Sequence, residues 1–443
     1  VNLISDICKV NILIINYYWP PSGGSVVQRW LSFCRFLPEY GITPIVLTVD
    51  DKKATYPSID KSLLSDIPKD LKVCKTDTAE LFWLYKGTIG KGNVPAAAFA
   101  NESNPTFLQK AARFVRGNFF IPDPRNGWNK FALLKAKELI ESNNIQAIVT
   151  AGPPHSTHLI GLKIKKHFPD IKWIADFHDV WTDVIYYDKF YHTNWAKKKD
   201  AGFEKEVLET ADRVLTVGRG YKEKLLSKSK LINPDKIEII TMGYDERCFT
   251  YESHPPRDEF VITYTGTIAD YYHPEVFLEA LKEVKEKNND VKFKLRFVGI
   301  LSDGIKSKIH EMGLSDILND VGYVSHDDSI KYLMDSTVLL LINPVVSNED
   351  MVIPGKVYEY LAARKPIINI TKKSSDLAWI VSEADAGETF ERSMKPELAA
   401  FLRKLTAKWR ANKNLDLPAG NKDYQKFSRH TEAKELSEII RSL

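Results

Sequence analysis

The chain opens on an alternation of apolar runs and helical segments. Residues 9–16 (KVNILIIN) form a short apolar run typical of a buried strand, and a Pro- and Gly-rich loop follows at 17–24. Apolar residues then recur at helical spacing over 25–39: Val27, Trp30, Leu31, Cys34 and Leu37. Gly41 is suited to ending this helix, and the next strand is predicted at 43–49. This order predicts a βαβ unit.

The first half of the chain continues in the same way. Further strands are predicted at 145–150, 171–176, 213–217 and 237–241, with helical stretches between them. Strands that alternate with helices are typical of a parallel sheet, so we expect an α/β domain here.

A polar, Pro-containing stretch at 252–259 separates this series from a second one. The strands of the second series are predicted at 260–266, 293–298, 338–342 and 366–370. We therefore expect two doubly wound α/β domains, one at 1–248 and one at 249–422. The tail at 423–443 has apolar residues at useful spacing for a helix: Phe427, Ala433, Leu436, Ile439 and Ile440.

Length and charge limit the function classes. A chain of 443 residues with 44% apolar content can bury two sizeable cores. Its formal net charge of +4 and pI of about 8.5 are too mild for a nucleic-acid binder, although they permit weak attraction to an anionic membrane. No apolar run approaches the length of a membrane span, and no signal sequence is recognised, so we expect a cytoplasmic or peripherally attached protein.

The cysteines indicate neither disulfides nor zinc. Cys8, Cys34, Cys74 and Cys248 show no paired spacing and have no histidine companions. Four free thiols in a reducing compartment are the interpretation, and no metal is expected.

The segment 352–368 (VIPGKVYEYLAARKPII) predicts a helix and the strand after it. Pro354 suits a first helical position, and Gly355 leaves the backbone amides there uncovered. Lys356 adds a positive charge at this helix end, where an anion can bind, and Glu359 lies within reach of the same group. Amides and lysine suit phosphate oxygens, whereas a carboxylate accepts hydrogen bonds from ribose hydroxyls, so the chemistry points to a nucleotide.

A plainer interpretation of this segment stays open. Val357 and Leu361 lie on one helical face and can simply pack against a core, with the charges of the helix in water.

Ligands of doubly wound sheets bind beyond the carboxyl ends of the strands, and two such domains in tandem face a shared cleft. The loop after the first strand holds Gly23 and Gly24, where the backbone can approach an anion at the helix start. A tight turn without a ligand explains the same glycines. In the loop at 150–159, His155 and His158 can face the cleft, and capping or packing roles are equally open.

The loop at 174–183 (IADFHDVWTD) is the more specific candidate for catalysis. His178 and Asp179 follow a strand end, so an imidazole stands beside a carboxylate that can orient it or accept from a substrate hydroxyl. Asp179 and Asp183 lack further oxygen ligands at regular spacing, which argues against a metal site. The run HDD at 326–328 is interpreted as a helix start, with Ser325 and Asp328 forming a capping box.

An amphipathic helix is predicted at 105–117 (PTFLQKAARFVRG). Its apolar arc is Phe107, Leu108, Ala111, Phe114 and Val115, with Lys110, Arg113 and Arg116 opposite. Such a helix can lie in a membrane interface or pack against the first domain with its basic face in water.

Taken together, these segments resemble the glycosyltransferases of the GT-B fold, most closely the retaining family 4. The resemblance covers nearly the whole chain. Its motifs occur in family order: YYWPPSGGSVVQRW at 17–30, YTGTI at 264–268, RFVG at 296–299, GYVSHDD at 322–328 and PGKVYEYLAARKPII at 354–368. The resemblance implies a nucleoside diphosphate sugar donor on the second domain, an acceptor on the first, and a C-terminal helix that crosses back to the first domain.

The resemblance also implies roles for single residues. Glu359 would bind the ribose hydroxyls, Lys356 and the amides near Pro354 and Gly355 the donor phosphates, and Gly24 with Gly23 would approach the phosphate next to the sugar. His178 matches the family histidine that touches the transferred sugar. The loop that would flank the base is Gly322, Tyr323 and Val324.

Three positions depart from the family pattern. Met351 occupies the place of the first of two family glutamates, and Glu349 is out of register with it. After Gly266, the places of a family Arg and Lys correspond to Thr267 and His273. Charge compensation would then fall to Lys356, with Arg29 as a further candidate.

We therefore expect a metal-independent, retaining glycosyltransferase that acts on a glycan or lipid-linked acceptor in surface polysaccharide synthesis. A catalytically silent protein of the same fold that binds a nucleotide or a partner transferase, and a nucleotide-sugar epimerase, are the alternatives.

Overall fold

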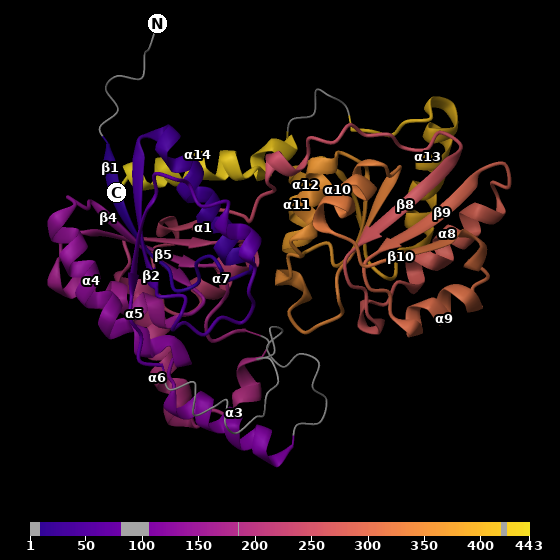
Figure 1. Cartoon of the computed structure of the whole chain (residues 1–443). Coiled ribbons are helices and arrows are strands. Elements are labelled where there is room, and N and C mark those ends of the chain that lie inside the picture. The colour runs from indigo at the N-terminus through magenta and orange to yellow at the C-terminus, as the bar shows by residue number, and fades with distance from the viewer. Residues whose placement is uncertain (1–8, 81–105, 185, 418–422) are drawn as a thin grey trace, which may run out of the picture. The chain divides into compact units, whose positions relative to one another are not determined.

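The computed structural model describes residues 9–80, 106–184, 186–417 and 423–443, and the chain divides into two compact units (Figure 1). The first unit runs to Thr241 and takes in the last residues from Glu432, and the second is Met242–Thr431. The predicted division was at residue 248. Residues 242–248 belong to the second unit because Tyr244 is buried in that unit's core, where its amide donates to the Phe427 carbonyl at 2.9 Å.

The first unit is built on a seven-stranded parallel sheet of order β3-β2-β1-β4-β5-β6-β7. Its strands are β1 Val10–Ile15, β2 Ile42–Val49, β3 Lys72–Thr76, β4 Ala147–Gly152, β5 Lys172–Phe177, β6 Arg213–Thr216 and β7 Ile237–Ile239. The predicted strands are confirmed, and β3 is an addition. The sequence KVCKT of β3 lies at the sheet edge and is only partly buried, so it has no apolar run to mark it.

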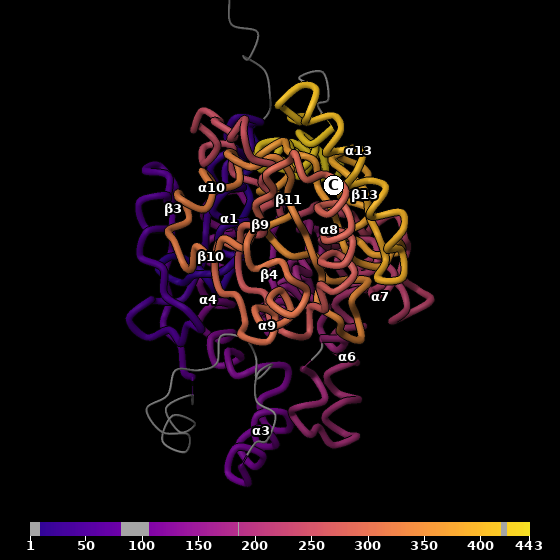
Figure 2. The backbone as a smooth tube through the Cα atoms, turned by 90° about the vertical axis from the view of Figure 1, so that its right-hand side faces the viewer, coloured from indigo at the N-terminus to yellow at the C-terminus, as the bar shows by residue number. Residues whose placement is uncertain are grey.

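Seven described α-helices accompany this sheet. They are α1 Ser25–Phe36, α3 Phe107–Phe119, α4 Asn129–Ser142, α5 Ser156–His167, α6 Asn194–Thr210, α7 Arg219–Leu226 and α14 Arg429–Arg441. The predicted helix at 25–39 ends in a 3-10 turn, Leu37–Tyr40, and Gly41 closes that turn at a φ of 72°. Figures 1 and 2 both place α3 beside α6.

Strand β1 shows how the sheet buries both faces. Successive side chains of a strand point to opposite faces. Ile12 and Ile14 join one core cluster with residues of α1 and α14, whereas Leu13 and Ile15 join another with residues of α4 and α5. A strand buried on both sides must be apolar at every position, which explains the uninterrupted run in the sequence.

The second unit repeats the plan with a six-stranded parallel sheet of order β10-β9-β8-β11-β12-β13. Its strands are β8 Glu259–Thr265, β9 Lys292–Val298, β10 Leu318–Gly322, β11 Val338–Ile342, β12 Ile367–Ile370 and β13 Gly387–Phe390. Its described α-helices are α8 Glu275–Glu286, α9 Asp303–Glu311, α10 His326–Met334, α11 Lys356–Ala363, α12 Asp376–Glu383 and α13 Lys395–Asn412. The two edge strands β10 and β13 were not predicted, because both are rich in exposed and polar positions.

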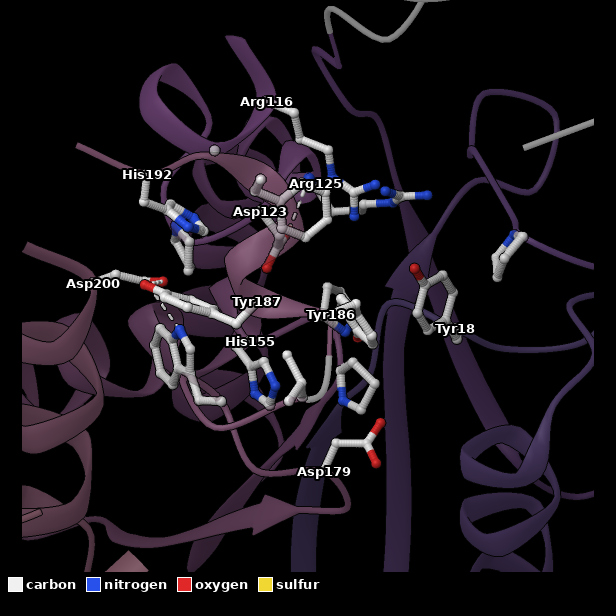
Figure 3. Close-up of a pocket in the computed structure, with 18 residues that line it drawn as sticks. Tyr18, Arg116, Asp123, Arg125, His155, Asp179, Tyr186, Tyr187, His192 and Asp200 are labelled. Carbon is white, nitrogen blue, oxygen red and sulfur yellow. Dashed lines mark hydrogen bonds between the residues drawn. The ribbon is translucent and has the colours of Figure 1, made fainter. Parts of the chain in front are cut away.

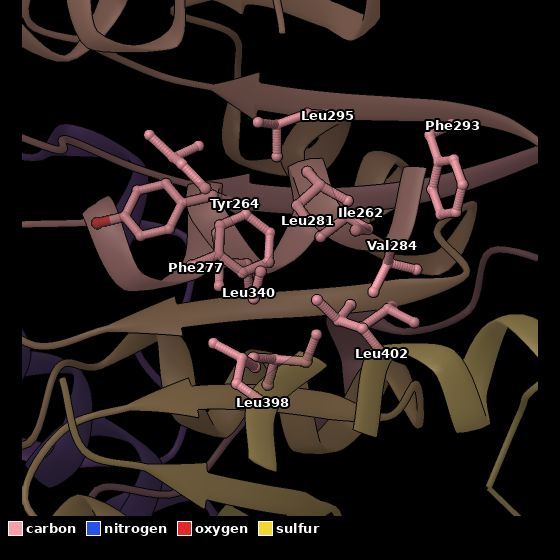
Figure 4. Close-up of a cluster of buried hydrophobic side chains, with 14 of the residues drawn as sticks. Ile262, Tyr264, Phe277, Leu281, Val284, Phe293, Leu295, Leu340, Leu398 and Leu402 are labelled. Carbon is pink, nitrogen blue, oxygen red and sulfur yellow. The ribbon is translucent and has the colours of Figure 1, made fainter. Parts of the chain in front are cut away.

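The core of the second unit is again divided by its sheet into two clusters, and Figure 4 shows one of them. On one face Ile262, Tyr264 and Leu340 pack against Phe277 and Leu281 of α8. On the other face, β11 and β12 pack against α10, α11 and α12. This second cluster fixes the start of α11, which carries the nucleotide-type motif of the sequence.

The C-terminal segment consists of a 3-10 turn, Asp423–Phe427, and helix α14. Ala433, Leu436 and Ile440 of α14 pack into the first unit's core, and Arg441 donates to the Tyr40 carbonyl at 2.6 Å. None of the helices formed by the described residues has the length and apolar character that a membrane span requires.

Candidate active site

Each unit has a point where the strand order reverses, between β1 and β4 in the first and between β8 and β11 in the second. At such a point the connections leave toward opposite faces and open a crevice beyond the carboxyl ends of the strands. The residues that follow those four strands, and the helices that begin beside them, are therefore where ligand-binding groups belong.

Lys356, the first residue of α11, lies against the end of β8. Its Nζ donates to the Tyr264 hydroxyl at 2.8 Å and to the Thr265 carbonyl at 2.6 Å. Gly266 has a φ of +92°, a backbone conformation that favours glycine, and a Cβ there would lie 3.0 Å from the lysine Nζ.

The ammonium of Lys356 sits in a poorly solvated place. Burial lowers the pKa of Lys356 to about 7, against the opposing effect of the Glu359 charge. Its two acceptors are a neutral hydroxyl and a neutral carbonyl. An anion bound beside it would supply the counter-charge that a desolvated ammonium needs.

Glu359 lies almost one turn beyond Lys356 on α11 and contacts a residue that the sequence analysis did not single out. The Nε2 atom of His326 is 2.9 Å from Glu359 Oε1, and this hydrogen bond is the main cause that raises the pKa of His326. His326 is the first residue of α10. Its predicted N-cap is confirmed, because the Asp328 amide donates to Ser325 Oγ at 3.2 Å, but in place of a full capping box the Asp328 carboxylate accepts from the same hydroxyl at 2.8 Å. The sequence 325–328 was interpreted as a cap alone, which concealed the histidine's other contact.

Helix α11 begins at Lys356, two residues later than the predicted start at Pro354. The first turn nevertheless closes there, because the Pro354 carbonyl accepts from the Val357 amide at 3.0 Å, and Gly355 is exposed. Val357 and Leu361 are fully buried, so the packing interpretation of this helix is correct for that face. It leaves the Lys356 and Glu359 side chains for another role.

The departures from the family pattern have a structural account. Met351 is buried, as is Glu349, whose carboxylate accepts from Arg392 Nη1 at 2.8 Å. Thr267 is exposed, and His273 Nδ1 is 3.6 Å from the Glu275 carboxylate. Neither Thr267 nor His273 brings a permanent positive charge.

The loop 322–324 lies at the end of the edge strand β10. Gly322 has a φ of +79° and its carbonyl accepts from the Gly299 amide at 2.7 Å. Tyr323 is 85% exposed and Val324 is partly buried. An exposed aromatic ring next to a glycine turn is able to stack on a planar base.

In the first unit, His178 follows β5 and meets the start of α1. Its Nε2 atom is 3.1 Å from Ser25 Oγ, and its amide donates to the Gly152 carbonyl at 3.1 Å. Gly24 precedes Ser25 with a φ of +117°, and a Cβ on Gly23 would lie 3.0 Å from Ser58 Oγ. The glycine pair therefore shapes the end of the loop between β1 and α1, which also presents Ser25 to the histidine.

The imidazole of His178 is neutral at physiological pH. Burial is the main cause that lowers the pKa of His178 to about 3, with smaller contributions from Arg29 and His155. Such a group can exchange hydrogen bonds with a substrate hydroxyl, but it is not a reservoir of protons near pH 7.

Asp179 lines a cavity of about 500 Å³ within the first unit (Figure 3). Figure 3 shows Asp179 and His155 on one side of this cavity and Arg116 and Arg125 on the other. Aromatic rings form much of the remaining wall: Tyr18, Trp181, Tyr186, Tyr187, Phe190 and His192. Burial raises the pKa of Asp179 to about 6.

The cavity wall is itself held by hydrogen bonds. Asp200 accepts from Trp181 Nε1 at 2.8 Å and from the Tyr187 hydroxyl at 2.9 Å, and burial raises its pKa to about 7. The ring of His155 stacks on Trp181 with centroids 5.0 Å apart. Apolar ring faces with a few carboxylates suit a ligand with C–H faces and several hydroxyls, such as a sugar.

Other candidates of the first unit are not brought to this cavity. His158 is fully buried, with Nδ1 2.8 Å from Thr150 Oγ1 and its ring stacked on Phe177. Arg29 is 1% exposed, donates to the Thr241 carbonyl, and has its Nε 3.6 Å from Asp176. Asp183 pairs with Lys228. These contacts tie the loops after β4 and β5 to the core.

The structural findings on thiols and metals cover the described residues only. Cys34, Cys74 and Cys248 are free thiols, and Cys8 lies outside the described residues. No group of three or more His, Cys, Asp or Glu side chains suited to a metal ion occurs in the part of the chain that the structure describes.

Four features of the site were not predicted from the sequence: Ser25, Tyr264, His326 and the cavity tyrosines. Tyr264 lies in the quoted motif YTGTI, so its neighbourhood was marked even though its hydroxyl was not. Ser25 directly follows the glycine pair, and a helix start beside a ligand loop is the signal that points to it.

Two family models match the chain one after the other. Residues 94–247 match Glycosyltransferase Family 4, and residues 250–422 match Glycosyl transferases group 1. A search of curated proteins finds no match.

Solved structures share the fold along nearly the full length. A glycosyltransferase from Rickettsia africae ESF-5 has a TM-score of 0.60 at 17% identity, covering 98% of each chain. The apo lipopolysaccharide outer core galactosyltransferase WaaB has a TM-score of 0.58 at 14% identity, covering 98% of this chain and 99% of that one. Sucrose-phosphate synthase from Thermosynechococcus elongatus has a TM-score of 0.53 at 15% identity, covering 98% of this chain and 99% of that one.

These likenesses establish a two-domain α/β fold of the GT-B type, as the sequence predicted. The two family models together cover most of the chain, and they meet at 247–250, a few residues after the division between its units. The chain therefore belongs to the GT-B glycosyltransferases of the GT4 type, and it is a transferase enzyme.

Proposed function

We propose that this enzyme transfers a sugar from a nucleoside diphosphate sugar to a hydroxyl of a glycan or lipid-linked acceptor. The proposal includes retention of anomeric configuration, no need for a divalent metal, and a place in surface polysaccharide synthesis. Its main support is one pair of side chains, Lys356 and Glu359, less than one turn apart at the start of α11 and beside Gly266.

This pair suits a nucleoside diphosphate. Among the described residues, the hydrogen-bond acceptors of the Lys356 ammonium are neutral, so phosphate oxygens would supply an anionic partner in direct contact. The Glu359 carboxylate can accept hydrogen bonds from two ribose hydroxyls in exchange for the one it shares with His326. Tyr323 is available to the base, and Gly322 with Val324 shapes the loop around it.

Departure of a nucleoside diphosphate concentrates negative charge on its terminal phosphate. A cation placed there in advance stabilises the transition state without reorganisation. Lys356 takes that role in our proposal, because Thr267 and His273 stand where the family pattern has permanent charges.

The first unit is proposed to hold the acceptor. Its cavity combines aromatic walls with the Asp179 carboxylate, a lining suited to a sugar. His178, neutral and 3.1 Å from Ser25 Oγ, is proposed to hydrogen-bond the transferred sugar. Asp179 is proposed to bind the acceptor hydroxyl, and as a carboxylate with a raised pKa it can also take up the hydroxyl proton.

The deciding experiment incubates the whole chain with a panel of labelled nucleotide sugars and candidate acceptors, with and without a chelator. Sugar transfer with retained configuration, seen by NMR and unaffected by the chelator, is expected. Conversion of the donor to a different nucleotide sugar would instead favour an epimerase. Nucleotide binding without turnover, whatever acceptor is supplied, would favour a catalytically silent binding protein.

A further inference from the structure

Helix α3 lies with its apolar side outward. Its buried positions are small or polar, among them Ala112, Gly117 and Asn118. Its exposed positions include Phe107 at 84%, Leu108 at 68% and Phe119 at 75%. An ordinary surface helix has the reverse arrangement, with the apolar stripe against the core.

Specific contacts hold α3 in this orientation. A Cβ on Gly117 would come within 2.6 Å of the Phe190 carbonyl, so the helix backbone lies directly on the turn before α6. The side-chain Nδ2 of Asn118 donates to the Tyr191 carbonyl at 3.2 Å, and Asn118 Oδ1 accepts from the Thr193 backbone amide at 2.7 Å. Turning the apolar side inward would break these bonds and move Asn118 from its buried position to the surface.

The start of α6 extends the exposed apolar area. Tyr191 and Trp195 are 42% and 62% exposed, and Figures 1 and 2 show α6 beside α3. We call the following set the apolar surface: Phe107, Leu108, Phe114, Val115, Phe119, Tyr191 and Trp195. These are seven of the fifteen exposed large hydrophobic residues in the described part of the chain. Clustering of this kind marks an interaction site.

Exposed lysines accompany the apolar surface on the same two helices. Lys110 of α3 and Lys197, Lys198 and Lys199 of α6 are exposed, whereas Arg113 is buried and Arg116 lines the cavity. Lys197 pairs with Asp188 at 3.0 Å, and Lys199 lies 4.9 Å from the Trp195 ring centroid. The combination of exposed aromatic rings with surrounding cations matches the headgroup region of an anionic bilayer.

We propose that the apolar surface docks this enzyme on an anionic lipid bilayer. Phe107, Leu108 and Phe119 enter the boundary between headgroups and acyl chains, and Lys197 and Lys198 contact the lipid phosphates. The inference extends the amphipathic helix expected at 105–117, of which residue 105 lies outside the described residues, to the start of α6. It does not depend on the identity of the donor or the acceptor.

Cosedimentation of the whole chain with vesicles tests the docking. We expect binding to phosphatidylcholine vesicles that contain phosphatidylglycerol, and binding that is weaker to pure phosphatidylcholine and at high salt. The double variant Leu108→Ser with Phe119→Ser should lose about tenfold or more in vesicle affinity. Lys197→Glu with Lys198→Glu should lose a comparable factor, chiefly for the anionic vesicles.

Leu134→Ser is the matched control, because Leu134 is 63% exposed on α4 and lies outside the apolar surface. All substituted side chains are exposed, and melting temperatures will show that the variants remain folded. Equal vesicle binding by the Leu108/Phe119 variant and the parent would overturn the proposal. A parent protein that does not bind vesicles, but forms a dimer that this variant disrupts, would also overturn it. The apolar surface would then pair two copies of the chain.

Discussion

The Nε2 atom of His326 lies 2.9 Å from Oε1 of Glu359, so the carboxylate assigned to the donor ribose already has a partner. A ribose must displace this partner or share the carboxylate with it. The free energy of donor binding therefore includes the cost of loosening the pair, and that cost depends on the charge of the histidine.

Replacing His326 by Ala should change the pH dependence of donor binding. Glu359 raises the pKa of His326, so as pH falls through the raised value the imidazolium forms and holds the carboxylate more tightly. We expect the variant to bind nucleoside diphosphate more tightly than the parent at pH 6, and by a smaller factor at pH 8.5. Calorimetry at the two pH values decides this. A ratio of affinities that does not change with pH would show that the charge of the histidine plays no part, and equal affinities at both pH values would show that the histidine does not compete.

Glu359→Gln should weaken donor binding by about 1.5–3 kcal/mol, because a charged acceptor of ribose hydroxyls is replaced by a neutral one. Calorimetry with the nucleoside diphosphate gives the value. Glu388→Gln, an exposed substitution on β13, is the control. Unchanged affinity in a folded Glu359→Gln protein would show that the ribose does not bind at Glu359 of α11.

Lys356→Ala should lower turnover roughly 10²-fold or more, by analogy with the loss of one preorganised donor to developing charge. Affinity for the nucleoside diphosphate should fall as well, while the nucleoside without phosphates should bind variant and parent alike. Lys287→Ala, an exposed residue that caps the C-terminal end of α8, serves as control. If diphosphate affinity and turnover survived the change at Lys356, the phosphates would have to be held elsewhere.

The same lysine predicts a pH effect in the parent. The pKa of Lys356 is about 7 in the free protein, below its ordinary value, and a bound phosphate would raise it. Donor binding should then take up a proton at pH values above about 7, and diphosphate affinity should decline as pH rises through this range. Calorimetry in buffers of different ionisation enthalpy measures the proton uptake. Lys356→Ala should show none.

His178→Ala should lower kcat far more than it weakens nucleotide binding, since the imidazole is assigned to the sugar. Because the pKa of His178 is about 3, the parent's rate should show no titration of this residue between pH 5 and 9. His167→Ala, an exposed change on α5, is the control. A rate equal to that of the parent would mean that His178 does not act on the sugar. The role would then fall to His155 or to no histidine.

Asp179→Asn should stabilise the fold while it lowers activity. The folded pKa of about 6 lies above the unfolded value of about 3.9, so ionisation destabilises the native state. The penalty is absent below about pH 4, grows between pH 4 and 6, and is complete above. We expect a gain of about 1–3 kcal/mol at pH 8, seen as a higher melting temperature, and none at pH 4.

Asp170→Asn provides the comparison for that measurement, since Asp170 is exposed. Equal melting temperatures for parent and Asp179→Asn at pH 8 would contradict the prediction. They would mean that ionisation of Asp179 does not destabilise the native state.

The sequence predicted most of the fold because strands such as β1 and β11 are buried on both faces and must be apolar throughout. The edge strands β3, β10 and β13 have one open side, so their composition resembles that of loops. The site was predictable where function depends on neighbours in sequence, as at Lys356 and Glu359. Contacts between distant positions, such as Ser25 with His178 or His326 with Glu359, depend on tertiary packing that one sequence does not reveal.

Helix α3 lies between the cavity and the proposed membrane surface. Arg116 and Gly117 line the cavity that holds Asp179, whereas Phe107, Leu108 and Phe119 lie on the outward side proposed to enter a bilayer. An acceptor anchored by a hydrocarbon chain would then reach the cavity by lateral diffusion, without leaving its leaflet. Its reaction rate would follow its mole fraction in the membrane, not its bulk concentration. Diluting such an acceptor with inert lipid at a fixed total amount would slow the enzyme only if catalysis takes place in two dimensions.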